Sequence, residues 1–156
     1  VRSHGGFVDV QSQLNQGSQF RIFLPANRTS PPTIDETSEI HPGQQQLILI
    51  VDDEAAICET MKETLLMQDY QVLVAQDGIE AVALMAQHQQ QIRAVLMDLM
   101  MPTLDGLATL PLLRRFNPDL CAIAMSGLTA TESVAQAKEL GFQGFLQKPF
   151  TRKDLL

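Results

Sequence analysis

Short apolar runs that end at polar residues recur along the chain from residue 47 onward. They cover 47–51, 94–97, 122–125 and 144–147. Stretches with helical spacing lie between them; Ile57, Met61 and Leu65, for example, share one face of a first helix. Runs this short and this apolar are typical of strands buried on both faces. The alternation therefore predicts a parallel sheet with crossover helices on both of its faces.

Helix boundaries carry their own signals. Asp77 with Glu80 brackets the start of a second helix, and Thr129 with Glu132 is the pattern of a capping box for a fourth, which Gly141 should end. Residues 107–113 have helical leucine spacing, but they include a proline without the amide that would bond back along the helix. We therefore expect a kink or a late start in the third helix.

The residues before 47 differ from the rest of the chain. In residues 1–24, a glycine pair precedes two alternating runs, Phe7 to Gln11 and Phe20 to Leu24, which predicts a helix end and then an antiparallel hairpin turning at Asn15 to Gly17. Residues 25–46 hold four prolines and a glutamine run, so we expect a flexible linker. Three regions result: 1–24, 25–46 and 47–156.

Acidic residues close two of the apolar runs. Asp52 and Asp53 follow the first run and Asp98 follows the second, so in a parallel sheet all three should converge in one crevice. Charges about 4 Å apart repel by about 4 kcal/mol at an effective dielectric near 20, so the cluster requires a cation. Mg²⁺ prefers oxygen ligands and recruits phosphate. Helix capping is the alternative role, but a cap uses one aspartate, and here Asp52 and Asp53 are adjacent. Asp98 is a weaker candidate for a cap, because we expect it to lie on a loop.

Two more polar residues end apolar runs. Ser126 follows the run 122–125, and Lys148 follows 144–147. Each alone has a simple explanation, because serine before glycine signals a turn and lysine before proline is common in solvated loops. With the three aspartates they make five polar groups at the ends of four strands. That combination indicates metal-assisted phosphoryl chemistry.

Composition is that of a cytoplasmic signalling module. The 156 residues carry a formal net charge of −7 and are 45% hydrophobic, enough for one modest core. The acidic balance argues against direct nucleic-acid binding, and no apolar run is long enough to span a membrane. Cys58 and Cys121 lie among apolar neighbours and are expected to be buried free thiols rather than a disulfide or metal pair. No signal peptide is visible.

Four stretches resemble the receiver domain of two-component response regulators. They are Leu-Ile-Leu-Ile-Val-Asp-Asp-Glu at 47–54, Met-Asp-Leu-Met-Met-Pro-Thr-Leu-Asp-Gly at 97–106, Ala-Met-Ser-Gly at 124–127 and Lys-Pro-Phe at 148–150, in the family's order and spacing. The resemblance implies a flavodoxin-like α/β fold with a five-stranded parallel sheet in the order 2-1-3-4-5.

The same resemblance implies a role for each site residue. Asp98 would be the phosphoacceptor, taking a phosphoryl group from a phosphohistidine donor. Asp53 would bind Mg²⁺ directly and Asp52 mainly through water, with the Met100 carbonyl as a further ligand. Ser126 would be the switch hydroxyl and Phe145 the switch aromatic. Lys148 would be the cation that follows the phosphoryl group. In this family the side chains at 100 and 128 flank the path of hydrolytic water; here they are Met and Leu.

The first region has a resemblance of its own. Residues 3–12 and 17–25 are similar to the last segment of a histidine-kinase ATPase domain, and the order kinase tail, linker, receiver is that of a hybrid histidine kinase. The donor would then be the chain's own kinase core or a histidine phosphotransfer protein, and the parent protein would be the kinase, with any membrane anchor upstream. This chain itself should lack an ATP site. His4 is expected to be structural, and His41 and His88 solvated.

Two alternatives and one departure from the family pattern remain. A Mg²⁺-dependent phosphohydrolase with an aspartate nucleophile would also use Asp, Ser and Lys, but such enzymes carry Asp-x-Asp on the first strand, where this chain has adjacent aspartates. The second alternative is a purely structural pseudo-receiver, and the presence of Asp98 and Lys148 argues against it. The fifth helix should begin near Thr151 and is truncated at Leu156, which should expose apolar surface on one sheet face.

Overall fold

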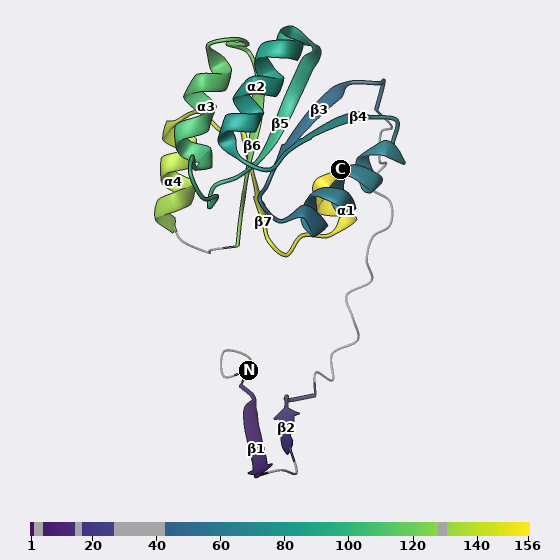
Figure 1. The fold of residues 1–156 in the computed structure, drawn as a ribbon, viewed down its shortest axis with the longest axis vertical. Coiled ribbons are helices and arrows are strands. Elements are labelled where there is room, and N and C mark those ends of the chain that lie inside the picture. Colours follow the sequence, from purple (N-terminus) through teal and green to yellow (C-terminus); the bar gives the residue numbers. More distant parts are fainter. Residues whose placement is uncertain (2–4, 15–16, 27–42, 128–130) are drawn as a thin grey trace. The chain divides into compact units, whose positions relative to one another are not determined.

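The computed structural model describes residues 1, 5–14, 17–26, 43–127 and 131–156 (Figure 1). The chain divides into two units, Val1–Glu39 and Ile40–Leu156. Most of the predicted linker, residues 27–42, lies outside the described residues, as do His4 and His41.

The larger unit is built on a five-stranded parallel sheet. Its strands are β3 (Leu47–Val51), β4 (Gln71–Ala75), β5 (Ile92–Asp98), β6 (Cys121–Ser126) and β7 (Gly144–Gln147). Their order in the sheet is β4-β3-β5-β6-β7. Counted from β3, this is the predicted order 2-1-3-4-5. The flavodoxin-like fold is confirmed.

Helices cover both faces of this sheet (Figure 1). They are α1 (Ala55–Leu66), α2 (Gly78–His88), α3 (Gly106–Arg114), α4 (Thr131–Glu139) and α5 (Arg152–Leu155), and a short 3-10 helix, η2 (Gln89–Gln91), leads into β5. One core cluster joins the sheet to α2, α3 and α4, and a second joins its other face to α1 and α5. Central strand residues such as Leu49, Ile50 and Val95 are fully buried. That burial explains why the strands read as continuous apolar runs.

The predicted starts of α2 and α5 and the predicted end of α4 agree with the structure. The Asp77 side chain accepts from the Glu80 amide at 2.8 Å, and the Glu80 carboxylate accepts from the Gln76 amide at 2.8 Å. Gly141, with φ of 88°, follows α4, and Thr151 caps α5 through a capping box with Asp154. The predicted Thr129 cap of α4 lies outside the described residues.

Of the two alternatives expected for α3, the late start is wrong, and a kink at Pro111 stays a prediction. The helix begins at Gly106, and Pro111 lies inside it. The Asp105 side chain accepts from the Ala108 amide at 2.8 Å, while Leu110 and Leu113 are fully buried. An N-cap stabilises a helix by about 1 kcal/mol, and each buried leucine contributes about 1.5–3 kcal/mol. Together these contributions offset the amide that Pro111 lacks.

The smaller unit contains the predicted hairpin. Strands β1 (Phe7–Gln13) and β2 (Gly17–Phe23) pair antiparallel, with Val8 opposite Ile22 and Val10 opposite Phe20. These four side chains share one face of the hairpin and are between 46% and 68% exposed. The hairpin is therefore as predicted, but its apolar face has no cover within the described residues.

Candidate functional site

The three acidic residues meet at the carboxyl end of the sheet. Val51 at the end of β3 pairs with Met97, so Asp52 and Asp98 follow neighbouring positions on adjacent strands. Asp52 is fully buried, Asp98 is 5% exposed and Asp53 is exposed. One carboxylate oxygen from each lies within 4.8 Å of the others. The predicted acidic cluster is therefore present in the folded chain, with hard oxygen donors suited to a divalent cation.

Lys148 joins two of these carboxylates. It follows β7, and its Nζ donates to Asp52 Oδ2 at 2.6 Å and to Asp98 Oδ2 at 2.7 Å, with only 13% of the lysine side chain exposed. Burial alone would lower the pKa of Lys148, but the hydrogen bonds and charges of the two aspartates outweigh it and hold that pKa above its ordinary value. The ammonium therefore stays charged at neutral pH.

Backbone amides hold the other oxygen of each buried aspartate. The Met100 amide donates to Asp98 Oδ1 at 3.0 Å, and the Glu54 amide donates to Asp52 Oδ1 at 3.0 Å. Both aspartates are thus fixed between an amide on one side and an ammonium on the other. Such fixed donors pre-organise the carboxylates before any substrate arrives.

Ser126 and Phe145 lie on the next two strands of the sheet, β6 and β7. Ser126 ends β6 and is 1% exposed, and its carbonyl accepts from the Lys148 amide at 2.9 Å. Phe145 lies in β7 opposite Ala124 and packs, half-buried, against the core that contains α2, α3 and α4. The structure therefore brings Ser126 to the same sheet edge as the acidic cluster.

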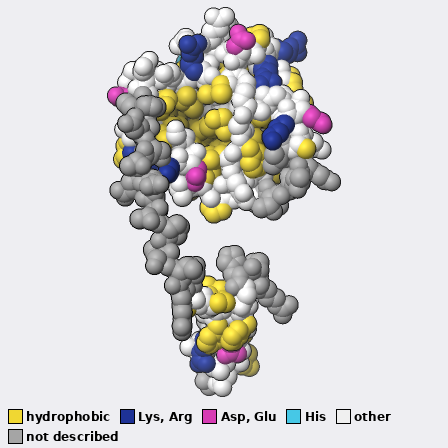
Figure 2. All heavy atoms as spheres, turned by 180° about the vertical axis from the view of Figure 1, so that it is seen from behind, with side chains coloured by type: hydrophobic (Ala, Val, Ile, Leu, Met, Phe, Trp, Pro, Cys, Tyr) yellow, Lys and Arg dark blue, Asp and Glu magenta, His cyan; other side chains and the backbone are white. Residues whose placement is uncertain are grey.

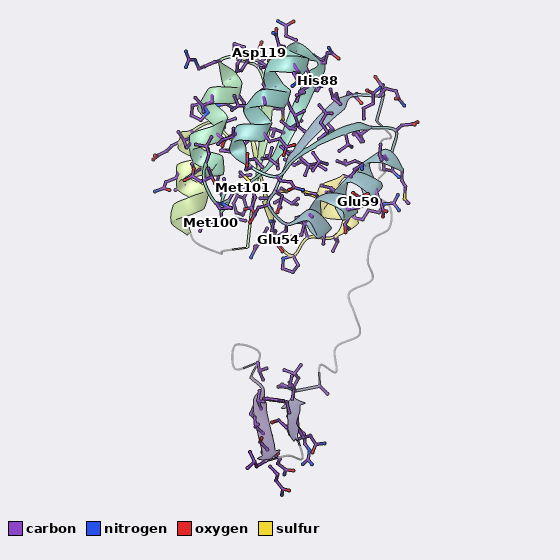
Figure 3. The ribbon with its side chains drawn as sticks, in the orientation of Figure 1. Glu54, Glu59, His88, Met100, Met101 and Asp119 are labelled. Atoms are coloured by element: carbon purple, nitrogen blue, oxygen red, sulfur yellow. The ribbon has the colours of Figure 1, made fainter. Side chains whose placement is uncertain are left out.

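Met100 lies beside the cluster at the surface. Its side chain is 64% exposed, whereas Met101 is only 7% exposed. Figure 3 shows Met100, Met101 and Glu54 at one end of the larger unit, with His88 and Asp119 at the other. His88 is the last residue of α2 and is partly exposed. Residue 128 lies outside the described residues.

Two site features escaped the sequence-based prediction. Gly106 packs so closely on the Asp98 carbonyl that a Cβ would collide with it. Cys58 was expected only to be a buried thiol, and it is buried and free, while free Cys121 is half-buried. The Cys58 thiol also donates to the Asp52 carbonyl at 3.3 Å. Burial, reinforced by the Asp52 carboxylate, raises the pKa of Cys58 to about 11, so the thiol remains a donor at neutral pH.

Comparison with known families decides the assignment. The family described as the response regulator receiver domain matches residues 48–156. The chain belongs to this family. Its match favours the receiver interpretation over the phosphohydrolase alternative.

Two curated relatives place the receiver domain in different contexts. The response regulator MprA of Mycobacterium sp. (strain KMS) is 39% identical over 112 residues, which cover 70% of this chain and 46% of the relative. The sensor kinase CckA of Brucella abortus (strain 2308) is 28% identical over 164 residues, which cover 99% of this chain and 17% of the relative. The chain thus spans less than half the length of either relative.

Solved receiver structures share the fold. CheY4 of Vibrio cholerae has a TM-score of 0.66 and 26% identity, covering 71% of this chain and 92% of CheY4. The CheX–CheY complex with BeF3 and Mg²⁺ from Borrelia burgdorferi gives a TM-score of 0.66 and 27% identity, covering 70% of this chain and 82% of the matched chain.

A groove of about 580 Å³ opens next to Lys148 in this receiver domain. It is lined by the start of α1 and its N-cap, by the residue after β6 and by the turn between β7 and α5: Glu54, Ala56, Ile57, Thr60, Met61, Gly127, Lys148, Pro149 and Phe150. Most of these side chains are apolar. Figure 2 shows hydrophobic side chains gathered at the surface of one face of this unit. Among the described residues, no helix has the length and apolarity to cross a bilayer.

Proposed function

We propose that Asp98 is the phosphoacceptor of this receiver domain and that phosphohistidine is its donor. The observation that carries the proposal is the buried Asp52–Lys148–Asp98 bridge, which places a carboxylate and a fixed ammonium within 2.7 Å of each other. An aspartate oxygen can attack phosphorus as a covalent nucleophile. The lysine then supplies positive charge where the transferred group develops negative charge.

We further propose that Asp53, Asp52, Asp98 and the Met100 carbonyl hold Mg²⁺. The donor chemistry fits, because three carboxylate oxygens lie within 4.8 Å of one another and Asp53 is open to solvent. Mg²⁺ usually binds through one or two carboxylates and keeps several water ligands. When bound, the ion would offset the charge of the phosphoryl oxygens. The Borrelia complex, which contains Mg²⁺ and BeF3, supports this assignment by similarity.

The residues of the site divide the transfer step between them. An oxygen of Asp98 forms the new bond to phosphorus as the bond from phosphorus to the histidine nitrogen breaks, and the electron pair of that bond stays on the imidazole. The Met100 amide fixes the orientation of the Asp98 carboxylate through its hydrogen bond to Oδ1. Lys148 exchanges its bond to Asp98 for one to the new phosphoryl group. Positioning and charge therefore do most of the catalytic work.

Ser126 and Phe145 would convert the new charge into a conformational signal. Ser126 ends the strand next to that of Asp98, so its hydroxyl can donate to the phosphoryl group. Phe145 is half-buried on the following strand and can move inward if that rearrangement makes room. A local charge change biasing a two-state element is a common switch design.

The groove beside Lys148 is our proposed approach for the donor. A phosphohistidine lies on a helix or loop of another domain, and its imidazole must reach Asp98 from the solvent side. The groove runs from the apolar side chains of α1 to Lys148. Apolar contacts there would hold the donor while its phosphoryl group meets the carboxylate.

We infer that the parent protein is a hybrid sensor histidine kinase. The CckA alignment covers almost the whole chain, hairpin included, whereas the MprA alignment covers only 70% of it. The hairpin's uncovered apolar face also suits the edge of a larger domain. The donor would then be the protein's own kinase core or a histidine phosphotransfer protein, and the setting cytoplasmic.

Labelling by a small phosphodonor tests the acceptor assignment. Acetyl phosphate with Mg²⁺ should add one phosphoryl group to the wild-type chain, measured by intact mass. Asp98→Asn should take up none, because its amide oxygen is a poor nucleophile. Asp69→Asn, which changes an aspartate on the loop between α1 and β4, is the matched control and should label normally. Undiminished labelling of Asp98→Asn would refute the proposal.

This chain should not bind ATP by itself. An ATP site needs a closed pocket with phosphate-binding loops, and the described part of residues 1–24 supplies a single hairpin with an exposed apolar face. Calorimetric titration with Mg·ATP should give no heat of specific binding, and the chain should not phosphorylate itself from ATP. Micromolar affinity for Mg·ATP would contradict this expectation.

A further inference from the structure

Cys58 links helix α1 to the backbone of the acidic cluster. It is the fourth residue of α1, its side chain is buried, and its Sγ donates to the carbonyl oxygen of Asp52 at 3.3 Å. Other buried residues of α1, such as Met61 and Leu65, only pack against the sheet. Cys58 therefore has a polar contact as well as a packing role.

The Asp52 carbonyl depends on this contact. Strand pairing of β3 ends at Val51, and the Asp52 amide still reaches the Ala75 carbonyl of β4 at 3.1 Å. Within the described residues, no backbone amide donates to the Asp52 carbonyl, and Asp52 is fully buried. A buried carbonyl that loses its donor is destabilised and tends to shift toward another partner. Removing the thiol donor would thus loosen this peptide.

The orientation of that peptide matters for the cluster. Its carbonyl belongs to the peptide group that joins Asp52 to Asp53, so its plane sets the direction in which the Asp53 side chain leaves the loop. Asp53 is exposed, and for its side chain no hydrogen bond or ion pair is found within the described residues. The backbone is then the main constraint on where its carboxylate lies.

We propose that Cys58 is a positioning residue for the divalent cation, acting through the Asp52 carbonyl to hold the Asp52–Asp53 peptide. This inference rests on the proposed Mg²⁺ site. Residues that orient metal ligands through hydrogen bonds, without touching the metal, commonly alter metal affinity when they are mutated. A residue that merely filled the core would change the stability of the fold and leave the affinity of the folded protein for Mg²⁺ unaltered.

A matched pair of variants separates these roles. Cys58→Ser keeps a donor of similar size, whereas Cys58→Ala removes the donor and differs from serine by one hydroxyl. Cys121→Ala, at the opposite end of the sheet, controls for loss of a thiol. Mg²⁺ affinity is measured by calorimetric titration of the full chain, and unfolding by urea in the presence of EDTA reports stability without metal.

We expect Cys58→Ala to weaken Mg²⁺ binding by about 3- to 10-fold. Cys58→Ser and Cys121→Ala should stay within about twofold of wild type. At limiting Mg²⁺, Cys58→Ala should also label more slowly with acetyl phosphate, and saturating Mg²⁺ should restore the wild-type rate.

Two results would overturn the proposal: wild-type Mg²⁺ affinity in Cys58→Ala, or equal losses in the Ser and Ala variants. Failure of the wild-type chain itself to bind Mg²⁺ or to accept a phosphoryl group would instead refute the proposed function. The two failures are therefore distinguishable.

Discussion

The receiver sheet and the N-terminal hairpin both contain apolar strand residues, but the sheet buries them and the hairpin leaves them exposed. Leu49 at the centre of β3 is fully buried, whereas Phe20 in β2 is 68% exposed. Both regions also contain ion pairs. Lys148 meets Asp98 at 2.7 Å in a nearly buried site, while Arg21 meets Asp9 at 3.8 Å with both side chains about half exposed. The difference shows that strand residues form a core and a site only when further layers cover them.

Core truncation should separate the two regions most strongly. Leu49→Ala leaves a cavity between packed layers and should lower the free energy of unfolding of the receiver domain by about 2–5 kcal/mol. Phe20→Ala removes a side chain that is already solvated, so it should change that free energy by less than about 0.5 kcal/mol. Urea unfolding followed by circular dichroism measures both. Equal effects would show that the hairpin is part of the same cooperative unit.

Removing the buried cation, Lys148, should produce the next largest effect, a slower transfer of the phosphoryl group to Asp98. Lys148→Met, assayed with saturating Mg²⁺, should label with acetyl phosphate about 100-fold more slowly, because a fixed charge at the reacting group is lost. Arg21→Met removes the cation of the exposed pair and serves as the control, with no change expected. A labelling rate for Lys148→Met within about twofold of wild type would contradict the assigned role.

These contrasts also show what the sequence can and cannot predict. The cluster of Asp52, Asp98 and Lys148 was predictable, because parallel strands place their carboxyl ends at one edge. The strand order was predictable only through the resemblance to the receiver family. The start of α3 was not, because the effect of Pro111 depends on the Asp105 cap and on burial that only the folded chain creates. The Cys58 contact was equally invisible, since a thiol-to-carbonyl bond across a loop leaves no spacing pattern.

The lifetime of the phosphoryl group should respond to the surface around the site. Met100 is 64% exposed beside Asp98 and cannot orient a hydrolytic water by hydrogen bonding. Met100→Asn combined with Leu128→Glu should shorten the life of phospho-Asp98 about tenfold or more, which is about 1.4 kcal/mol of barrier. Decay after donor removal at fixed Mg²⁺ measures it. Met67→Asn, another exposed methionine, is the control, and unchanged decay in the double variant would exclude this explanation.

The smallest expected effect is a loss of stability at high pH. Burial raises the pKa of the Cys58 thiol in the folded chain from its ordinary value of 9.0 to about 11. The stabilisation that the protonated thiol contributes is therefore complete below pH 9 and is lost as the pH rises through about 11. At pH 10 the wild type should therefore have lost about 1 kcal/mol more than Cys58→Ser, relative to pH 8. Cys121→Ser keeps Cys58 and should behave like wild type. Parallel urea curves for wild type and Cys58→Ser at every pH would contradict this prediction.

Direct mapping of the phosphorylated residue tests the central claim. After labelling with acetyl phosphate and Mg²⁺, borohydride reduces an aspartyl phosphate to homoserine, and peptide mass spectrometry then locates the converted residue. We predict conversion at position 98 alone, with none at Asp9 in the hairpin or at Asp52 and Asp53 in the cluster. Conversion at another aspartate, or none anywhere in a chain that binds Mg²⁺, would contradict the assignment of Asp98 as the phosphoacceptor.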